Sequence, residues 1–240
     1  WPPSPTCNPA PERDTTMTLP TEPGPWWLIG SVVACGGALG LWMSRQLAKG
    51  GYRLDDEWQH PLPRRPWLVA GLVPVVWGLL AWRAGGPATL LTVPALLLVG
   101  CVGVALAWID VDVHRLPHGL TYPCALGVLA LVAVASAVTG DWPSAARALL
   151  SGVAAYLVLF MLALVSRGQF GLGDVTLGGI LGVALGHLDA RLPWWALAFA
   201  FLLSGVVAAA GLLTRRLSLR SDVAFGPYLL VGALLAVLVG

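Results

Sequence analysis

The chain has 240 residues, of which 57% are hydrophobic and only 11% are charged, and its mean hydropathy is +0.77. Soluble domains carry about 25% charged residues, so this composition excludes an ordinary water-soluble protein and indicates a membrane protein. The formal net charge of +2, without a basic patch, gives no reason to expect a nucleic-acid partner. The four cysteines form no C-x-x-C pair, so we expect neither a cysteine zinc site nor a disulfide framework.

Two regions follow from this composition. Residues 1–25 are rich in proline, threonine and glutamate, lack the pattern of a signal peptide, and are expected to form a disordered leader, with Met17 a candidate start of translation. We expect residues 26–240 to form an all-α, polytopic transmembrane bundle of about eight spanning helices. The apolar runs that predict these helices are 26–44, 67–82, 88–109, 120–139, 145–165, 174–188, 193–214 and 223–240. The sixth run is short, so its helix is expected to depend on its neighbours for burial.

Basic residues alternate between the loops that connect these runs. The odd-numbered loops hold ten Lys and Arg residues, whereas the even-numbered loops hold only Arg83, Arg147 and Arg191. Because cytoplasmic loops of membrane proteins are enriched in Lys and Arg, the odd loops are predicted to be cytoplasmic and both termini external. Tryptophans near the ends of the runs are typical of an interfacial belt. They are Trp26, Trp27, Trp67, Trp108, Trp142, Trp194 and Trp195.

Two aspartates stand at the same end of different predicted helices. Asp110 ends the third run and Asp174 opens the sixth, so both fall at the predicted cytoplasmic end. Two carboxylates that meet cannot both ionise cheaply, so one retains a proton, and the pair can act as general base and general acid. The alternative is that both are polar residues at helix ends, with Asp174 a helix cap.

A series of glycines follows Asp174 at four-residue intervals. Its members are Gly178, Gly182 and Gly186. They share one face of the predicted helix, and such a face lets a second helix approach closely. We expect this face to pack the sixth helix against the third and thereby to fix the distance between Asp110 and Asp174. The alternative is helix packing without a catalytic consequence.

Three motifs resemble those of a known family. Residues 171–174, Gly-Leu-Gly-Asp, form a G-x-G-D motif, the signature of intramembrane-type aspartyl peptidases, and its glycines give a backbone that can approach a substrate closely. Asp110 is followed seven places later by Pro117, which resembles the other half of the type IV prepilin peptidase pattern. Residues 225–228, Phe-Gly-Pro-Tyr, resemble the F-G-P element before the last helix of that family. The chain is therefore similar to the type IV prepilin peptidase family over about residues 89–233.

This resemblance implies that residues 26–240 form a transmembrane peptidase domain that removes short basic leader peptides from prepilins or pseudopilins. Cleavage would occur at the cytoplasmic face of the inner membrane, within membrane lipid, and without a cofactor or metal. Asp110 and Asp174 would be the catalytic pair. The motif or substrate-positioning residues would be Gly171, Gly173, Asp112, Pro117, Gly226 and Pro227.

The chain departs from the family pattern in three places. Thr176 stands where the family often has Lys, and His118 where it often has Asp or Asn, which affects fine substrate positioning. Bifunctional members carry paired C-x-x-C motifs after the first helix, but residues 45–66 contain no cysteine here. We therefore expect a peptidase without N-methyltransferase activity.

The residues also suggest two other interpretations. His114 and His118 have a spacing that can bind a metal on a helix, but Pro117 argues against a helix there. A small transporter or channel would also use glycines and inner-face acids. Against it, no charged residue falls at mid-bilayer and the two halves of the chain show no clear repeat.

Overall fold

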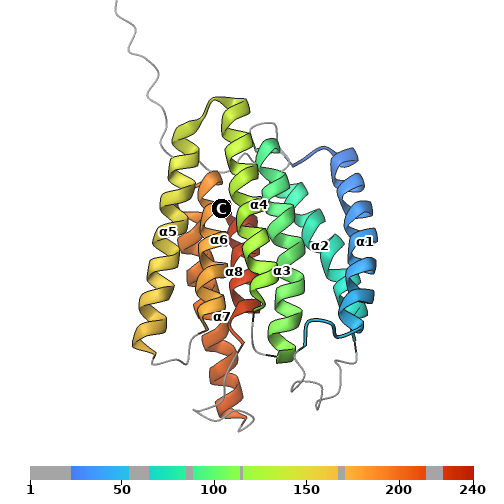
Figure 1. The fold of residues 1–240 in the computed structure, drawn as a ribbon, viewed down its shortest axis with the longest axis vertical. Coiled ribbons are helices and arrows are strands. Elements are labelled where there is room, and N and C mark those ends of the chain that lie inside the picture. The colour runs from blue at the N-terminus through green and yellow to red at the C-terminus, as the bar shows by residue number, and fades with distance from the viewer. Residues whose placement is uncertain (1–22, 54–64, 85–88, 114–115, 167–170, 215–223) are drawn as a thin grey trace, which may run out of the picture.

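The computed structural model describes residues 23–53, 65–84, 89–113, 116–166, 171–214 and 224–240. These residues form eight α-helices and one short 3-10 helix, and they include no β-strand (Figure 1). The elements are α1 (Trp26–Ala48), α2 (Trp67–Ala84), η2 (Leu90–Thr92), α3 (Val93–Val113), α4 (His118–Thr139), α5 (Trp142–Val165), α6 (Leu172–Leu188), α7 (Leu192–Leu213) and α8 (Gly226–Val239). Some of the predictions fall on residues that lie outside the described ranges. These are residues 1–22 of the predicted leader, His114 of the possible metal site, and most of the basic residues of the odd loops.

The all-α helical bundle expected from the apolar runs is confirmed. Six helices are long and apolar enough to cross a membrane, and the chain is a multi-pass membrane protein. The other two are shorter, with 17 residues in α6 and 14 in α8. Most side chains of α6 are buried, because α3, α4, α5, α7 and α8 all contact it. The expected dependence of the sixth helix on its neighbours is therefore confirmed.

Consecutive helices run in opposite directions through the bundle, as Figure 1 shows. The C-terminal end of α3 and the N-terminal ends of α6 and α8 consequently lie at the same end, the lower one in this view. The sequence places Asp110 in the last turns of α3 and Asp174 in the first turn of α6. The expectation that both carboxylates fall at one end of the bundle is thus met.

The glycine series of α6 packs against α5, not against α3. A Cβ atom placed on Gly182 would lie 2.8 Å from Gly152 Cα, and one placed on Gly186 would lie 2.4 Å from Ser151 Cβ. A Cβ atom on Gly178 would lie 2.1 Å from Leu159 Cδ1. All of these partners belong to α5, so the predicted partner helix was wrong. The physical reason is that α5 offers its own face of small residues, which matches the glycines and lets the two backbones meet.

Two further helix pairs are joined in the same way. Between α1 and α2, a Cβ on Gly40 would lie 3.0 Å from the carbonyl oxygen of Ala70. Between α7 and α8, a Cβ on Gly232 would lie 2.4 Å from the carbonyl oxygen of Ala196. Lipid chains are as apolar as leucine, so close backbone packing of this kind replaces the hydrophobic effect as the force between the helices.

Arg147 ties α5 to α6 at the opposite end of the bundle from Asp174. Its Nε donates to the carbonyl oxygen of Gly186 at 3.0 Å, and its Nη2 donates to that of His187 at 2.9 Å. These carbonyls belong to the last turn of α6, where no intrahelical donor is available, and a cation there is favoured by the helix dipole. The position of α6 is therefore fixed by α5 from Gly178 to its last turn.

Replacing Gly182 with isoleucine is expected to destabilise the bundle by about 1–3 kcal/mol, the usual cost of overpacking a tight contact. The new side chain would force α5 and α6 apart, since even a Cβ atom at this position would lie 2.8 Å from Gly152 Cα. The midpoint of thermal unfolding in detergent measures this loss. Gly205→Ile in α7 is the control, because a Cβ atom there meets nothing within 4 Å. Equal midpoints for the two variants would contradict the packing described.

The tryptophans at helix ends mostly face outward. Trp26, Trp67 and Trp142 are 84%, 62% and 59% exposed, as an interfacial belt requires. Trp108 differs, because it packs against the core cluster that α1, α2 and α3 share. Its place in the belt stays a prediction. Its place two residues before Asp110 makes it part of the packing near the candidate site.

Candidate active site

Asp110 and Asp174 lie together at the end of the bundle where α3 ends and α6 begins. Both are buried, with 4% and 6% of their surface exposed. The backbone N–H of Gly226 donates a hydrogen bond of 3.2 Å to Asp110 Oδ2. A Cβ atom placed on Gly226 would lie 2.9 Å from Asp110 Oδ2 and 3.3 Å from Asp174 Oδ1. The two carboxylates therefore flank one glycine, and helices α3, α6 and α8 contribute one member each.

The start of α6 explains the position of Asp174. Gly171 is the N-terminal cap in extended conformation, and Asp174 follows in the first turn. There the positive end of the helix dipole favours a carboxylate. The Oδ1 atom of Asp174 is buried and finds no hydrogen-bond partner among the residues that the structure describes. Because buried oxygens are normally hydrogen-bonded, this atom is suited to accept a proton or hydrogen bond from water or from a bound peptide.

The start of α8 explains the position of Gly226. Phe225 is the cap residue, Gly226 opens the helix, and Pro227 occupies its first turn. The first N–H groups of a helix have no intrahelical acceptor, so that of Gly226 is available to Asp110. Proline lacks this donor and has a fixed φ, so it fits the helix start. The ring of Phe225 packs on Phe201 of α7, with 5.1 Å between the ring centroids, and so anchors the beginning of α8.

Gly173 and Pro117 shape the neighbouring turn. A Cβ atom on Gly173 would lie 2.8 Å from Leu116 Cβ, so the start of α6 rests directly on the segment that leads into α4. Pro117 is the N-terminal cap of α4, with an extended backbone. Both motif residues thus bring the beginnings of α4 and α6 together beside the carboxylates. Their predicted role in positioning a substrate stays a prediction.

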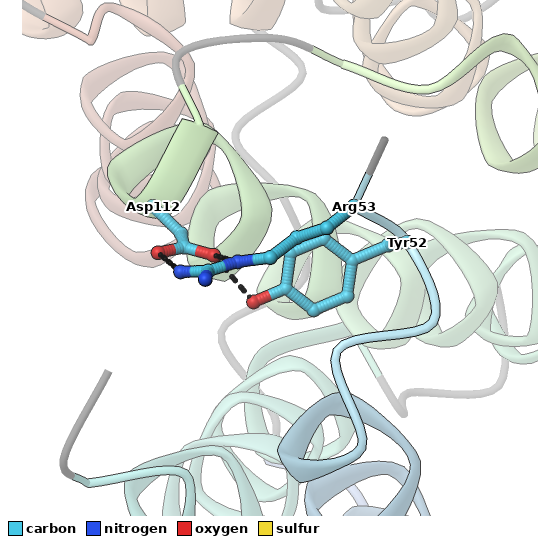
Figure 2. A network of polar contacts seen from close by, with 3 residues as sticks. All are labelled: Tyr52, Arg53 and Asp112. Carbon is cyan, nitrogen blue, oxygen red and sulfur yellow. Dashed lines mark hydrogen bonds and ion pairs between the residues drawn. The ribbon is translucent and has the colours of Figure 1, made fainter. Parts of the chain in front are cut away.

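Asp112, two residues beyond Asp110, binds the segment that follows α1 (Figure 2). Arg53 donates to it from Nε at 2.9 Å and from Nη2 at 2.5 Å, and Tyr52 donates from its hydroxyl at 2.6 Å. The side chains of this ion pair are only 1% exposed for Arg53 and 7% for Asp112. Sequence reasoning missed both partners, because their one signal was the general excess of basic residues in the first loop.

The phenol of Tyr52 remains a hydrogen-bond donor over the whole physiological pH range. Burial, followed by the hydrogen bond to Asp112, raises the pKa of Tyr52 to about 12. Its proton is therefore retained at neutral pH and at moderately alkaline pH. The result is a three-residue latch, formed by Tyr52, Arg53 and Asp112, that joins the end of α1 to the end of α3 two residues beyond Asp110.

Breaking the latch from one side is expected to lower stability more than removing both charges. Asp112→Asn removes the carboxylate that faces Arg53, and Arg53→Met removes the cation that faces Asp112, so each breaks the buried ion pair while one of its charges stays in place. The double variant should recover part of the lost thermal stability, measured as the unfolding midpoint in detergent. The exposed Arg65→Met serves as control and should change little. Strictly additive losses in the double variant would contradict this coupling.

Other polar residues singled out in the sequence lie near the helix starts. His118 stacks on Tyr122 with 5.0 Å between ring centroids, and the Thr176 hydroxyl donates to the carbonyl oxygen of Leu172 at 3.1 Å. Within the described ranges, no group of three or more His, Cys, Asp or Glu side chains could hold a metal ion.

Comparison of the sequence with known proteins identifies the family to which this membrane protein belongs. The sequence profile of the type IV leader peptidase family matches residues 96–213. A prepilin leader peptidase/N-methyltransferase of Dickeya chrysanthemi is 30% identical over 243 aligned residues, which cover 96% of this chain and 71% of that protein. The chain belongs to the type IV leader peptidase family. The match to the profile of the type IV leader peptidase family runs from α3 to the end of α7 and includes Asp110 and Asp174.

Other members of the type IV leader peptidase family match over shorter stretches. A prepilin leader peptidase/N-methyltransferase of Aeromonas hydrophila is 36% identical over 155 residues, or 61% of this chain and 49% of that protein. One of Bacillus subtilis strain 168 is 34% identical over 92 residues, or 38% of this chain and 36% of that protein. The chain thus spans about half the length of the Aeromonas relative that it matches. No solved structure matches it.

Proposed function

We propose that this protein is an aspartic-type endopeptidase of the membrane that removes the short basic leader from prepilin-like or pseudopilin substrates. The observation that carries the proposal is the convergence of Asp110 and Asp174 on Gly226 from three separate helices. Burial of both carboxylates places them where the dielectric constant is lowered, and this strengthens their mutual coupling. Two helix-end residues that served only as caps would have no reason to share one glycine.

The chemistry that this pair can perform is hydrolysis with one shared proton. The ionised carboxylate takes a proton from a water molecule whose oxygen attacks the carbonyl carbon of the scissile peptide. The protonated carboxyl gives its proton to the carbonyl oxygen, and a tetrahedral diol results. When the C–N bond breaks, the departing nitrogen receives the proton of the pair, and one hydroxyl of the diol gives a proton back to the pair as the new carboxyl group forms. The pair therefore again holds one proton. Because the two groups titrate together, no separate protonation state is assigned to Asp110 or Asp174.

The names of the relatives support the substrate class. Those of Dickeya and Aeromonas are named prepilin leader peptidases, and the Dickeya protein aligns with 96% of this chain. The excess of Lys and Arg in the odd loops supports an orientation in which the carboxylates face the cytoplasm, at the inner membrane. A basic leader that has not crossed the membrane would be found on that side.

Leader removal from a prepilin-like substrate by the purified, lipid-reconstituted protein tests this function. We expect wild-type protein to release the leader without added metal or cofactor. A transporter or channel, the second interpretation of the sequence, would cleave nothing. The buried pair at one end favours the peptidase, since a conduction pathway requires polar groups at mid-membrane depth as well. Absence of cleavage with several prepilin-like substrates would overturn the proposal.

We propose further that the protein does not methylate the product. Its relatives are named for both activities, but the stretch between α1 and α2 contains no cysteine, in contrast to the paired C-x-x-C motifs of bifunctional members. Incubation of the processing reaction with methyl-labelled S-adenosylmethionine is expected to leave the processed pilin unlabelled. The Dickeya relative, assayed in parallel, is the positive control. Label on the pilin processed by this protein would show the prediction to be wrong.

A further inference from the structure

An apolar groove runs along the bundle between α2 and α8, with α3 and α6 behind it, and encloses about 330 Å³. Every residue that lines it is apolar. Val99 and Leu96 on its floor are 5% and 4% exposed, whereas Leu72 of α2 and Val231 of α8 on its rim are 49% and 47% exposed. The groove is therefore open toward the membrane and built for an apolar occupant.

The groove leads to the candidate active site. Its lining on α3 extends from Leu96 to Val111, which corresponds to about 22 Å at 1.5 Å per helical residue. At the inner end it is lined by Trp108 and Pro227. These residues lie two positions before Asp110 and next to Gly226, respectively, in the same helices. Because Gly226, the neighbour of Pro227, binds Asp110, the inner end of the groove lies at the end of the bundle that carries the carboxylate pair.

We infer that this groove binds the apolar helix of the prepilin-like substrate and thereby places the bond to be cleaved beside Asp110 and Asp174. The inference rests on the proposed function. A helix seated in the groove would be held by close van der Waals packing, the main force between helices in lipid. The chain that precedes this helix would then emerge at the inner end, beside the two carboxylates. The leader would be positioned by the helix that follows it rather than by its own side chains.

Charge favours a protein helix over a phospholipid as the occupant. A lipid chain that filled the groove would place its phosphate near Asp110 and Asp174, where like charges repel. A basic leader at the same place is attracted by the acidic pair. Both the apolar and the charged parts of the proposed substrate therefore match the surface that they would meet.

Photo-cross-linking from matched positions tests where the substrate lies. A photoreactive phenylalanine analogue is introduced at Val231 in the groove or at Val206 in α7, which is 59% exposed and lies outside the groove. Both are made in the Asp110→Asn variant, so that a bound prepilin-like substrate is not cleaved. We expect cross-links from Val231 to the apolar segment of the substrate and none above background from Val206. Equal yields at both positions, or cross-links from Val231 to lipid only, would overturn the inference.

Steady-state kinetics provide a second test, in which failure of the groove assignment can be distinguished from failure of the proposed function. In otherwise wild-type protein, Val231→Trp fills the groove and should raise the KM for a prepilin-like substrate with its full helix roughly tenfold, while Val206→Trp should not. Val206→Trp should leave cleavage of both the full substrate and a short peptide that ends soon after the scissile bond within about twofold of wild type, whereas Val231→Trp should impair the full substrate more than the short peptide. An unchanged KM in Val231→Trp, with active wild-type protein, overturns the groove assignment alone. Failure of the wild-type protein to cleave any prepilin-like substrate overturns the proposed function, and this inference with it.

Discussion

The Asp110→Asn and Asp174→Asn variants are each expected to lose leader cleavage by about a hundredfold or more, the contribution typical of a general acid or base. The amide keeps the shape of the side chain but can neither take a proton from water nor give one to the peptide. Both variants should fold, because the amide can still accept hydrogen bonds such as that from Gly226 to Asp110. Initial rates of leader release, with unfolding midpoints measured in parallel, provide the comparison.

Asp189→Asn is the matched control for this pair. Asp189 caps the other end of α6, where its Oδ1 accepts a hydrogen bond of 2.7 Å from the backbone N–H of Arg191. The amide can accept the same bond, so the rate of leader release should remain at the wild-type level. Full activity in either active-site variant would mean that its carboxylate takes no part in the reaction.

Replacing Gly226 with a larger residue is expected to lower the rate of leader cleavage strongly, because the new side chain would displace the Asp110 carboxylate. A Cβ atom there would lie 2.9 Å from Asp110 Oδ2, which is closer than such atoms approach one another, so the carboxylate must swing away. Misplacing a reacting group by about 1 Å can cost a hundredfold in rate. Gly226→Ala should show a clear loss in kcat and Gly226→Val a larger one. Because the atom displaced is the end of a rotatable side chain, the unfolding midpoint should change little.

Gly119 near the start of α4 offers the corresponding control at the same end of the bundle. A Cβ atom on Gly119 meets nothing within 4 Å, so Gly119→Ala and Gly119→Val should leave the rate of cleavage near that of wild type. Among the described residues, the glycines with a positive φ angle are Gly50 and Gly140. Gly226 is not one of them, so a larger residue at this position introduces no backbone strain of that kind. Wild-type rates in Gly226→Val would contradict the placement of both carboxylates around this residue.

The helices and their directions could be predicted from the sequence, because most of the apolar runs are long and the basic residues alternate between the loops. That information also placed Asp110 and Asp174 at one end of the bundle. The motif residues stand out in the sequence, but their places at helix starts were not predicted: Gly171 and Pro117 cap helices, and Gly226 and Pro227 open one. A helix start needs special residues, and those residues are visible in a sequence.

The partner of each helix face could not be predicted in the same way. The series Gly178, Gly182 and Gly186 indicated close packing, but any neighbouring helix with small residues could have filled it. In the structure it is α5, through Ser151 and Gly152. The distance between Asp110 and Asp174 is therefore not set by this face; α6 is held by α5, and Gly226 of α8 bridges to Asp110.

Long-range polar contacts were the second feature that the sequence did not predict. Asp112 pairs with Arg53 across 59 positions, and nothing local to either residue indicates the other. The apolar groove is equally invisible in the sequence, because residues of α2, α3, α6 and α8 that look alike in hydropathy divide into floor, rim and lipid-facing positions only after folding. Both features depend on which helices become neighbours, and this is decided by packing.

A double-mutant cycle on the rate of leader release tests most directly whether Asp110 and Asp174 act as one unit. The kcat/KM of Asp110→Asn, Asp174→Asn and the variant with both changes is measured on the same prepilin-like substrate. Residues that work together in one chemical step show strongly non-additive losses, so the double variant should be no slower than either single one. Losses that multiply in the double variant would mean that the two carboxylates act independently, and this would contradict a shared catalytic pair.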